Sequence, residues 1–242
     1  MTYKSKHAFW VPALLLLAAC DGGDSTEQAR APSEEALMRV AEASASYSGE
    51  DYTKIVSAGS MSESGFALGP ISIGNPDAPV TIIEYASLTC PHCAEFEHEV
   101  LKKLMDSHIR TGIVRFEFRN FVMNRYDLAV SALVRCRGAE QFYPLSDLFF
   151  SSQAQWLRNA RAAPDQVMDD IAAVARKAGI SRTEFDRCLA DRDIQTHLIE
   201  MTSSGQTEWQ ITGTPTIIVD GKKRGPEAQD YATLVGMIED AR

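Results

Sequence analysis

The spacing of apolar residues divides the chain into a β-rich part, a long helical part and a short closing unit of strands and a helix. Apolar and β-branched runs predict strands over 71–73, 80–85 and 114–118, and an amphipathic run over 96–109 predicts a helix between the last two. Because a strand, a helix and a strand follow in this order, we expect a right-handed crossover that joins two parallel strands.

After Asn120 the helical period continues as far as Trp209. The predicted helices cover 128–137, 142–150, 167–179, 181–189 and 194–209. A strand pattern returns at 216–219 and near 222–224, with a turn at Asp220-Gly221, and a last helix is expected from Asp230. The order predicts an α/β fold that is interrupted by a helical segment.

The first residues have the pattern of an export signal. Lys4 and Lys6 precede the apolar run 9–17, which is short for a membrane span and is broken by Pro12. We therefore predict a signal peptide over residues 1–19.

Leu17-Ala18-Ala19-Cys20 resembles the bacterial lipobox, in which the cysteine is lipidated and becomes the first residue of the mature chain. Lipidation of Cys20 is the favoured interpretation, and a conventional signal with an incidental Cys20 is the alternative. Residues 20–70 are then expected to be a lipidated tether and linker, in which a short helix could begin after Ser33. The folded domain would cover 71–242.

Composition agrees with a globular protein and limits the partners. The chain has 242 residues, of which 45% are hydrophobic, and a formal net charge of −9. A negative chain is repelled by nucleic acids and by anionic membrane surfaces, so no nucleic-acid partner is expected. No phosphate-binding or flavin motif stands out, and no cofactor is expected.

Cys90-Pro91-His92-Cys93 lies where a predicted strand ends and a predicted helix begins. The free N–H groups and the positive dipole end of a helix stabilise a thiolate just before it, so the pKa of Cys90 is expected to be low. Pro91 suits a first helical position, and a protonated His92 would add a positive charge. A thiolate is the form that attacks or leaves a disulfide.

Two distant features bear on this motif. Glu84 precedes Cys90 by six residues and could transfer a proton to or from Cys93, although it could also be an ordinary glutamate of an edge strand. Thr214-Pro215 precedes the apolar run 217–219 and is either a trans strand start or a cis peptide that shapes a tight loop.

Together these residues resemble the DsbA-like thiol-disulfide oxidoreductases of the thioredoxin superfamily. The resemblance implies a thioredoxin fold with a helical insertion at about 122–210. It also implies that Cys90 and Cys93 are the redox pair, and that Thr214-Pro215 is the cis-proline loop beside their disulfide.

The resemblance further implies a function in the periplasm. Such a protein introduces disulfide bonds into unfolded exported proteins with free thiols and is reset by a DsbB-like membrane protein. The best-known enteric oxidases have Val where Thr214 stands, and many isomerases and reductases have Thr. A disulfide isomerase or reductase is therefore the alternative.

The remaining cysteines, Cys136 and Cys188, lie on predicted helices. In an exported protein an even number of cysteines favours disulfides, so we expect a structural bridge between them; two separate buried thiols are the alternative. A different interpretation is a zinc or copper site that uses the Cys-x-x-Cys with His92, His98 or the distant cysteines. It is disfavoured because no second close pair of ligands is present, and no metal is expected.

Overall fold

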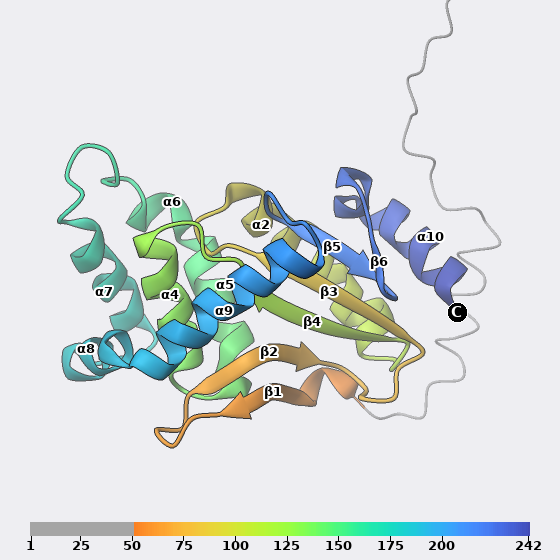
Figure 1. The fold of residues 1–242 in the computed structure, drawn as a ribbon, viewed down its shortest axis with the longest axis horizontal. Helices are drawn as coiled ribbons and strands as arrows, with labels where there is room; N and C mark the ends of the chain where they lie inside the picture. The colour runs from red at the N-terminus through yellow and green to blue at the C-terminus, as the bar shows by residue number, and fades with distance from the viewer. Residues whose placement is uncertain (1–50) are drawn as a thin grey trace, which may run out of the picture.

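The computed structural model describes residues 51–242, which form a mixed sheet covered by helices (Figure 1). The sheet has six strands in the order β1-β2-β4-β3-β5-β6. The strands are β1 (Val56–Met61), β2 (Ala67–Ile73), β3 (Val80–Ala86), β4 (Val114–Asn120), β5 (Thr216–Val219) and β6 (Lys222–Lys223). Within this sheet only the central pair β3 and β4 is parallel, which confirms the predicted parallel pairing of the two strands.

The folded part begins before the predicted boundary at Ile71. Phe66 and Ala67 are fully buried, and β2 starts at Ala67 and pairs with β1, so the prediction of a linker as far as Pro70 is wrong. Small residues (Ser57, Ala58, Gly59 and Ser60) make up most of the largely exposed edge strand β1, which therefore has no apolar run to signal it. The predicted signal peptide, lipidation at Cys20 and short helix after Ser33 lie outside the described residues.

One long helical segment follows β3 and packs against the sheet. It consists of α2 (Pro91–Phe96), η2 (Glu97–Leu101), α3 (Lys102–Leu104) and η3 (Met105–Ile109), and its η2 and η3 parts have π-helical hydrogen bonding. The last helix, α10 (Tyr231–Ala241), lies beside this segment. The Tyr231 hydroxyl donates a hydrogen bond to Ser107 Oγ in η3. The helix α9 (Arg192–Glu208) crosses the opposite face of the sheet (Figure 1).

The insertion between β4 and β5 is helical, as predicted; α4 to α8 lie at one end of the sheet, and α9 crosses a face of it (Figure 1). Its helices are α4 (Arg125–Arg135), α5 (Phe142–Ser151), α6 (Gln153–Trp156), α7 (Val167–Lys177), α8 (Arg182–Ala190) and α9 (Arg192–Glu208). The four residues of α6 are too few to show a period, so the sequence does not predict that helix. A disulfide joins Cys136, at the end of α4, to Cys188 in α8.

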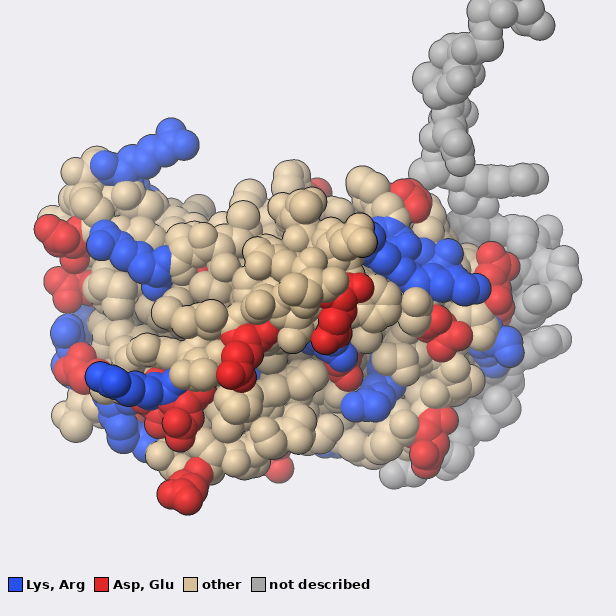
Figure 2. Space-filling view, viewed as in Figure 1, with Lys and Arg blue, Asp and Glu red and all other residues tan. Residues whose placement is uncertain are grey.

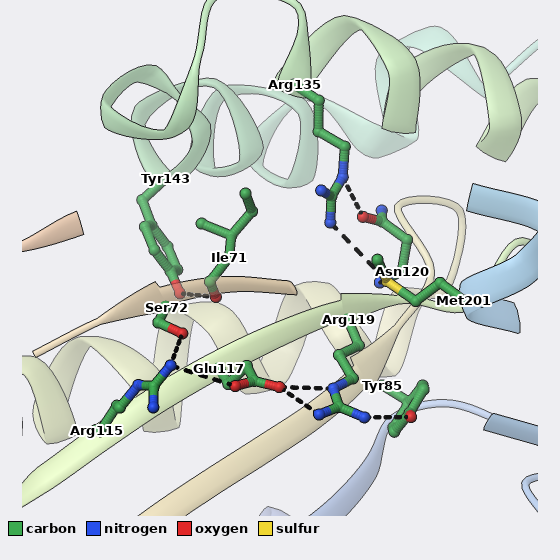
Figure 3. Close-up of polar contacts among 10 residues, drawn as sticks. All are labelled: Ile71, Ser72, Tyr85, Arg115, Glu117, Arg119, Asn120, Arg135, Tyr143 and Met201. Carbon is green, nitrogen blue, oxygen red and sulfur yellow. Dashed lines mark hydrogen bonds and ion pairs between the residues drawn. The ribbon is translucent and has the colours of Figure 1, made fainter. Parts of the chain in front are cut away.

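A buried arginine links the insertion to the sheet (Figure 3). Arg135 of α4 donates from Nε to Asn120 Oδ1 at 2.8 Å and from Nη1 to the carbonyl oxygens of Ala67 and Gly69. Burial lowers the pKa of its guanidinium to about 9. These contacts connect α4 to β2 and β4, so the insertion and the sheet share one core.

Charged groups are spread over the surface. Figure 2 shows acidic and basic side chains interspersed on one face of the described residues, with uncharged surface between them. Within residues 51–242, no helix is both long and apolar enough to cross a membrane.

Candidate active site

The Cys-x-x-Cys motif lies at the junction of β3 and α2. Cys90 is the N-cap of α2 with an extended backbone, and Pro91 occupies the first turn. Cys90 is 8% exposed, whereas Cys93 is completely buried, and the two thiols are unbonded in this structure. A partner molecule can therefore reach the sulfur of Cys90 and not that of Cys93.

The loop before β5 meets this junction. The Thr214–Pro215 peptide bond is cis, and the sulfur of Cys90 lies 3.3 Å from the carbonyl oxygen of Thr214. β5 pairs directly with β3, with Thr216 opposite Tyr85. Sheet pairing thus brings Cys90, which follows β3, and Thr214, which precedes β5, to the same end of the paired strands.

The surroundings separate the acidities of the two thiols. The pKa of Cys90 is lowered to about 5, chiefly by a hydrogen bond with Cys93, and burial opposes the shift; Thr214 and the backbone N–H groups of Cys93 and His92 also contribute to the lowering. Burial, the hydrogen bond with Cys90 and the nearby Glu84 raise the pKa of Cys93 well above its ordinary value. Near neutral pH the Cys90 thiol is ionised and the Cys93 thiol is protonated.

His92 acts on Cys90 through its backbone. Its ring is 71% exposed, and Nδ1 lies 3.6 Å from Glu95 Oε2, whereas its backbone N–H contributes to the low pKa of Cys90. The orientation of the helix start therefore stabilises the thiolate through N–H groups, as expected for a helix N-terminus.

Glu84 lies on the central strand β3, so its interpretation as an ordinary edge-strand residue is wrong. Its side chain is buried, and Oε2 has no hydrogen-bond partner among residues 51–242. Burial, with smaller contributions from Glu97 and Cys90, raises the pKa of this carboxyl well above its usual range. Glu84 can thus hold a proton at neutral pH beside the thiol pair.

Two further buried residues position the loop that carries Cys90. Asp127, in the first turn of α4, accepts hydrogen bonds from the backbone N–H groups of Leu88 and Met123, at 2.8 and 2.9 Å. Gln153 of α6 donates from Nε2 to the carbonyl oxygens of Leu88 and Cys90, at 2.9 and 3.0 Å. Neither residue belongs to a recognisable motif, so the sequence did not reveal them.

A shallow, mainly apolar hollow with a volume of about 420 Å³ opens beside Cys90. Met123, whose side chain stands 55% exposed, lies in its wall. The other lining residues are Thr89, Cys90, Pro91, Asn124, Tyr126, Leu157 and Ala160. The hollow provides an apolar surface next to the reactive sulfur.

The structure does not bring together the residues that were considered as ligands of a zinc or copper site. Cys136 and Cys188 are bonded to each other, and His98 lies next to Lys102 and Asp147. Within residues 51–242, no group of three His, Cys, Asp or Glu side chains is placed to hold a metal ion.

Comparison with known proteins identifies the family of this chain. A family model described as thioredoxin matches residues 67–240. A Rickettsia bellii protein, provisionally named a protein-disulfide oxidoreductase, is 28% identical over 150 residues, which are 62% of this chain and 56% of that protein. The chain thus spans about half the length of the first curated relatives that it matches.

Two solved structures share the architecture. A protein-disulfide isomerase from Novosphingobium aromaticivorans has a TM-score of 0.64 and 28% identity, over 72% of this chain and 97% of that one. Wolbachia pipientis alpha-DsbA1 has a TM-score of 0.62 and 24% identity, over 70% of this chain and 88% of that one, and shows the fold alone. The predicted fold and the resemblance to DsbA-like proteins are confirmed, and the chain belongs to the thioredoxin family.

Proposed function

We propose that the chain is a DsbA-type thiol-disulfide oxidoreductase that introduces disulfide bonds into exported proteins through Cys90 and Cys93. The observation that carries this proposal is the asymmetry of the pair. Cys90 is reachable and has a pKa of about 5, whereas Cys93 is buried and its pKa is raised. Stabilising the Cys90 thiolate favours the reduced protein, which makes its disulfide a stronger oxidant.

The reaction begins with Cys90 and Cys93 joined in a disulfide. A substrate thiolate attacks the sulfur of Cys90, the bond to Cys93 breaks, and Cys93 leaves with the electron pair and takes a proton from Glu84. A second substrate thiolate attacks the substrate sulfur of the mixed disulfide, and Cys90 leaves as a thiolate. The substrate has lost two electrons and gained a disulfide, and the protein is reduced.

The surroundings of Cys90 suit an unfolded polypeptide. An extended substrate segment can pair with the backbone at Thr214, which gives affinity with little preference for sequence. The apolar hollow beside Cys90 would accept an apolar side chain near the substrate cysteine. Both contacts favour unfolded chains, in which backbone and apolar side chains are accessible.

Location and partners are part of the same proposal. The export signal at residues 1–19 and the lipobox at Cys20 support a periplasmic protein that is held at a membrane by its lipid. Because each reaction leaves the protein reduced, turnover needs an oxidant, for which we propose a DsbB-like membrane protein. A Bacillus subtilis relative, 25% identical over 158 residues, is named disulfide bond formation protein D, which supports the oxidising direction.

The equilibrium reduction potential of the Cys90/Cys93 pair against glutathione tests this proposal, with Cys93→Ser as the variant that cannot form the disulfide. We expect a potential near that of enteric DsbA, about −120 mV. A potential near that of thioredoxin, about −270 mV, would contradict the oxidising direction.

A disulfide isomerase is the second candidate. Thr214 has the residue type of many isomerases, and the Novosphingobium aromaticivorans structure is named a protein-disulfide isomerase. If the chain is an isomerase, its reduced form should restore the correct pairing in a substrate with wrongly paired disulfides. If it is an oxidase, its oxidised form should form disulfides in a reduced substrate.

A further inference from the structure

A polar groove with a volume of about 300 Å³ lies along the loop that carries the cis Thr214–Pro215 peptide bond. It shares no lining residue with the apolar hollow beside Cys90, and it contains two basic side chains, Lys223 and Arg224. The carbonyl oxygen of Thr214 lies 3.3 Å from the sulfur of Cys90. A substrate segment that pairs with the backbone at Thr214 therefore runs beside this groove.

The end of α9 holds the ammonium group of Lys223 in place. Nζ donates to the carbonyl oxygens of Trp209 and Gln210, at 2.8 and 3.4 Å. The helix ends there, because Gln210 has a φ of +51° and the N–H of Ile211 bonds back to the carbonyl oxygen of Gly205. Free carbonyl groups at a helix C-terminus favour a cation. An ammonium group has three N–H donors, so one donor and the charge remain for a ligand.

Arg224 follows Lys223 and also lines the groove. Its Nε has no hydrogen-bond partner among residues 51–242, and a guanidinium can bind a carboxylate through two N–H groups. Within the described part of the chain, neither Lys223 nor Arg224 forms an ion pair. The nearby Glu227 accepts from the backbone N–H of Gly225. The groove thus offers two positive charges in a chain with a formal net charge of −9.

A second hollow near the active site has the opposite charge. It has a volume of about 330 Å³, lies between the active-site helix and the start of α10, and shares Gln229 with the basic groove. Its charged lining consists of three carboxylates and one lysine, apart from His92: Glu95, Glu99, Asp230 and Lys103. An acidic side chain of a substrate is repelled from this hollow and attracted to the basic groove.

We propose that the groove at Lys223 and Arg224 is a subsite that selects substrates with an acidic residue close to the reactive cysteine. The inference rests on the proposed exchange activity and names its substrate class. Pairing with the backbone at Thr214 gives little preference for sequence, and the two cations add one. The carboxylate of an Asp or Glu accepts from Lys223 Nζ and from the Arg224 guanidinium while the substrate cysteine reacts with Cys90.

The test is the rate at which the oxidised protein reacts with reduced cysteine peptides at low ionic strength. The peptides differ only in having Glu or Gln at one of the two positions on either side of the cysteine. The Glu-to-Gln ratio of the second-order rate constants is compared between wild type and Lys223→Gln, because a neighbouring Glu itself changes the reactivity of the peptide thiol. For at least one position we expect this ratio to be about fivefold higher in wild type.

Lys222→Gln is the matched control. Lys222 has the same charge and lies on the same strand, but neighbouring strand residues point to opposite faces, and Lys222 does not line the groove. Its ratio should equal that of wild type. Lys223→Glu should instead favour a peptide with Lys at the same position. The pKa of Cys90 should be unchanged in these variants, because Cys93, Thr214 and backbone N–H groups lower it.

Two further measurements keep the test independent of a single variant. Arg224→Gln should also lower the ratio. In wild type the preference for Glu should disappear in about 1 M salt, where the Debye length is about 3 Å. A preference that persists in this salt would overturn the charged subsite.

The outcomes separate the subsite from the exchange activity. Equal ratios in wild type and Lys223→Gln at every peptide position, or an equal loss in Lys222→Gln and Lys223→Gln, would overturn the subsite and leave the exchange activity intact. Failure of the wild-type protein to oxidise any of the peptides would instead refute the proposed function.

Discussion

The sulfur of Cys90 lies 3.3 Å from the carbonyl oxygen of Thr214, although 124 residues separate the two in the sequence. The contact follows from the direct pairing of β3 with β5, since Cys90 comes after the end of β3 and Thr214 before the start of β5. The helices α4 to α9 lie between these strands in the sequence and leave the pairing undisturbed, because α4 to α8 lie at one end of the sheet and α9 crosses one of its faces.

Replacing Cys93 tests the source of the low pKa of Cys90. The hydrogen bond with Cys93 is its largest cause, so Cys93→Ala should raise the pKa of Cys90 by about one unit or more from its value of about 5. Cys93→Ser keeps a hydroxyl donor and should raise it less. The pH dependence of thiolate absorbance or of alkylation measures both; a pKa of Cys90 in the Cys93→Ala variant equal to that of wild type would contradict the contribution of the Cys93 hydrogen bond.

The reduced and oxidised proteins should differ in how their stability depends on pH. Folding lowers the pKa of Cys90 from 9 to about 5. The Cys90 thiolate therefore contributes fully to the free energy of unfolding above pH 9, and this contribution is lost as the pH falls to 5. The oxidised protein has no thiol to titrate. The free energy of unfolding of the reduced form relative to the oxidised form should therefore rise by about 2 kcal/mol from pH 5 to 7, allowing for solvent near the sulfur. Denaturant unfolding of both forms measures this difference, and a pH-independent difference would contradict the low pKa.

Glu97→Gln should stabilise the protein at neutral pH. The pKa of Glu97 is raised on folding from 4.5 to about 8, so its stabilising effect is complete below pH 4.5 and is lost as the pH rises through 8. A glutamine has no proton to lose, and the variant should gain up to about 3 kcal/mol over wild type at pH 7 and little at pH 4. Thermal unfolding at the two pH values tests this, with Glu99→Gln as the control that should show no such change.

Gln153→Ala should destabilise the loop that carries Cys90. The substitution removes both hydrogen bonds that the amide donates to the carbonyl oxygens of Leu88 and Cys90. Leaving such buried acceptors without a donor costs about 1–3 kcal/mol. The exposed Gln155 lies on the same helix, and Gln155→Ala should change the free energy of unfolding by less than about 0.5 kcal/mol. Similar losses in the two variants would mean that the buried contacts contribute little.

The disulfide between Cys136 and Cys188 should contribute to stability and not to exchange. The two cysteines are 52 residues apart, and closing a loop of this length stabilises a fold by about 4 kcal/mol in the chain-entropy model. The double variant Cys136→Ser with Cys188→Ser should lose up to that amount in denaturant unfolding. It should keep the reactivity of Cys90, because the bond joins α4 to α8, whereas Cys90 begins α2. A lower reactivity at temperatures where the variant is folded would show that the bridge shapes the site.

The sequence by itself determined the features that depend on neighbouring residues. Hydrophobic period is a local property, so the strands β3, β4 and β5 and the helices of the insertion other than α6 could be predicted, and the junction that carries Cys90-Pro91-His92-Cys93 could be placed. The chemistry of Cys90 followed from the same junction, because helix N–H groups act on the residue just before them. The strand β1 escaped prediction because a mostly exposed edge strand has no apolar run.

The tertiary structure alone decided which distant groups meet. In the sequence Glu97 looks like any glutamate of a charged helix, and Gln153 like any amide in a loop region. Packing of the helices on the sheet buries Glu97 near Glu84 and turns Gln153 towards the carbonyl oxygens of the loop. Burial and the contacts between segments far apart in the chain are what raise the pKa values of Glu84 and Glu97, so these properties arise only when the chain is folded.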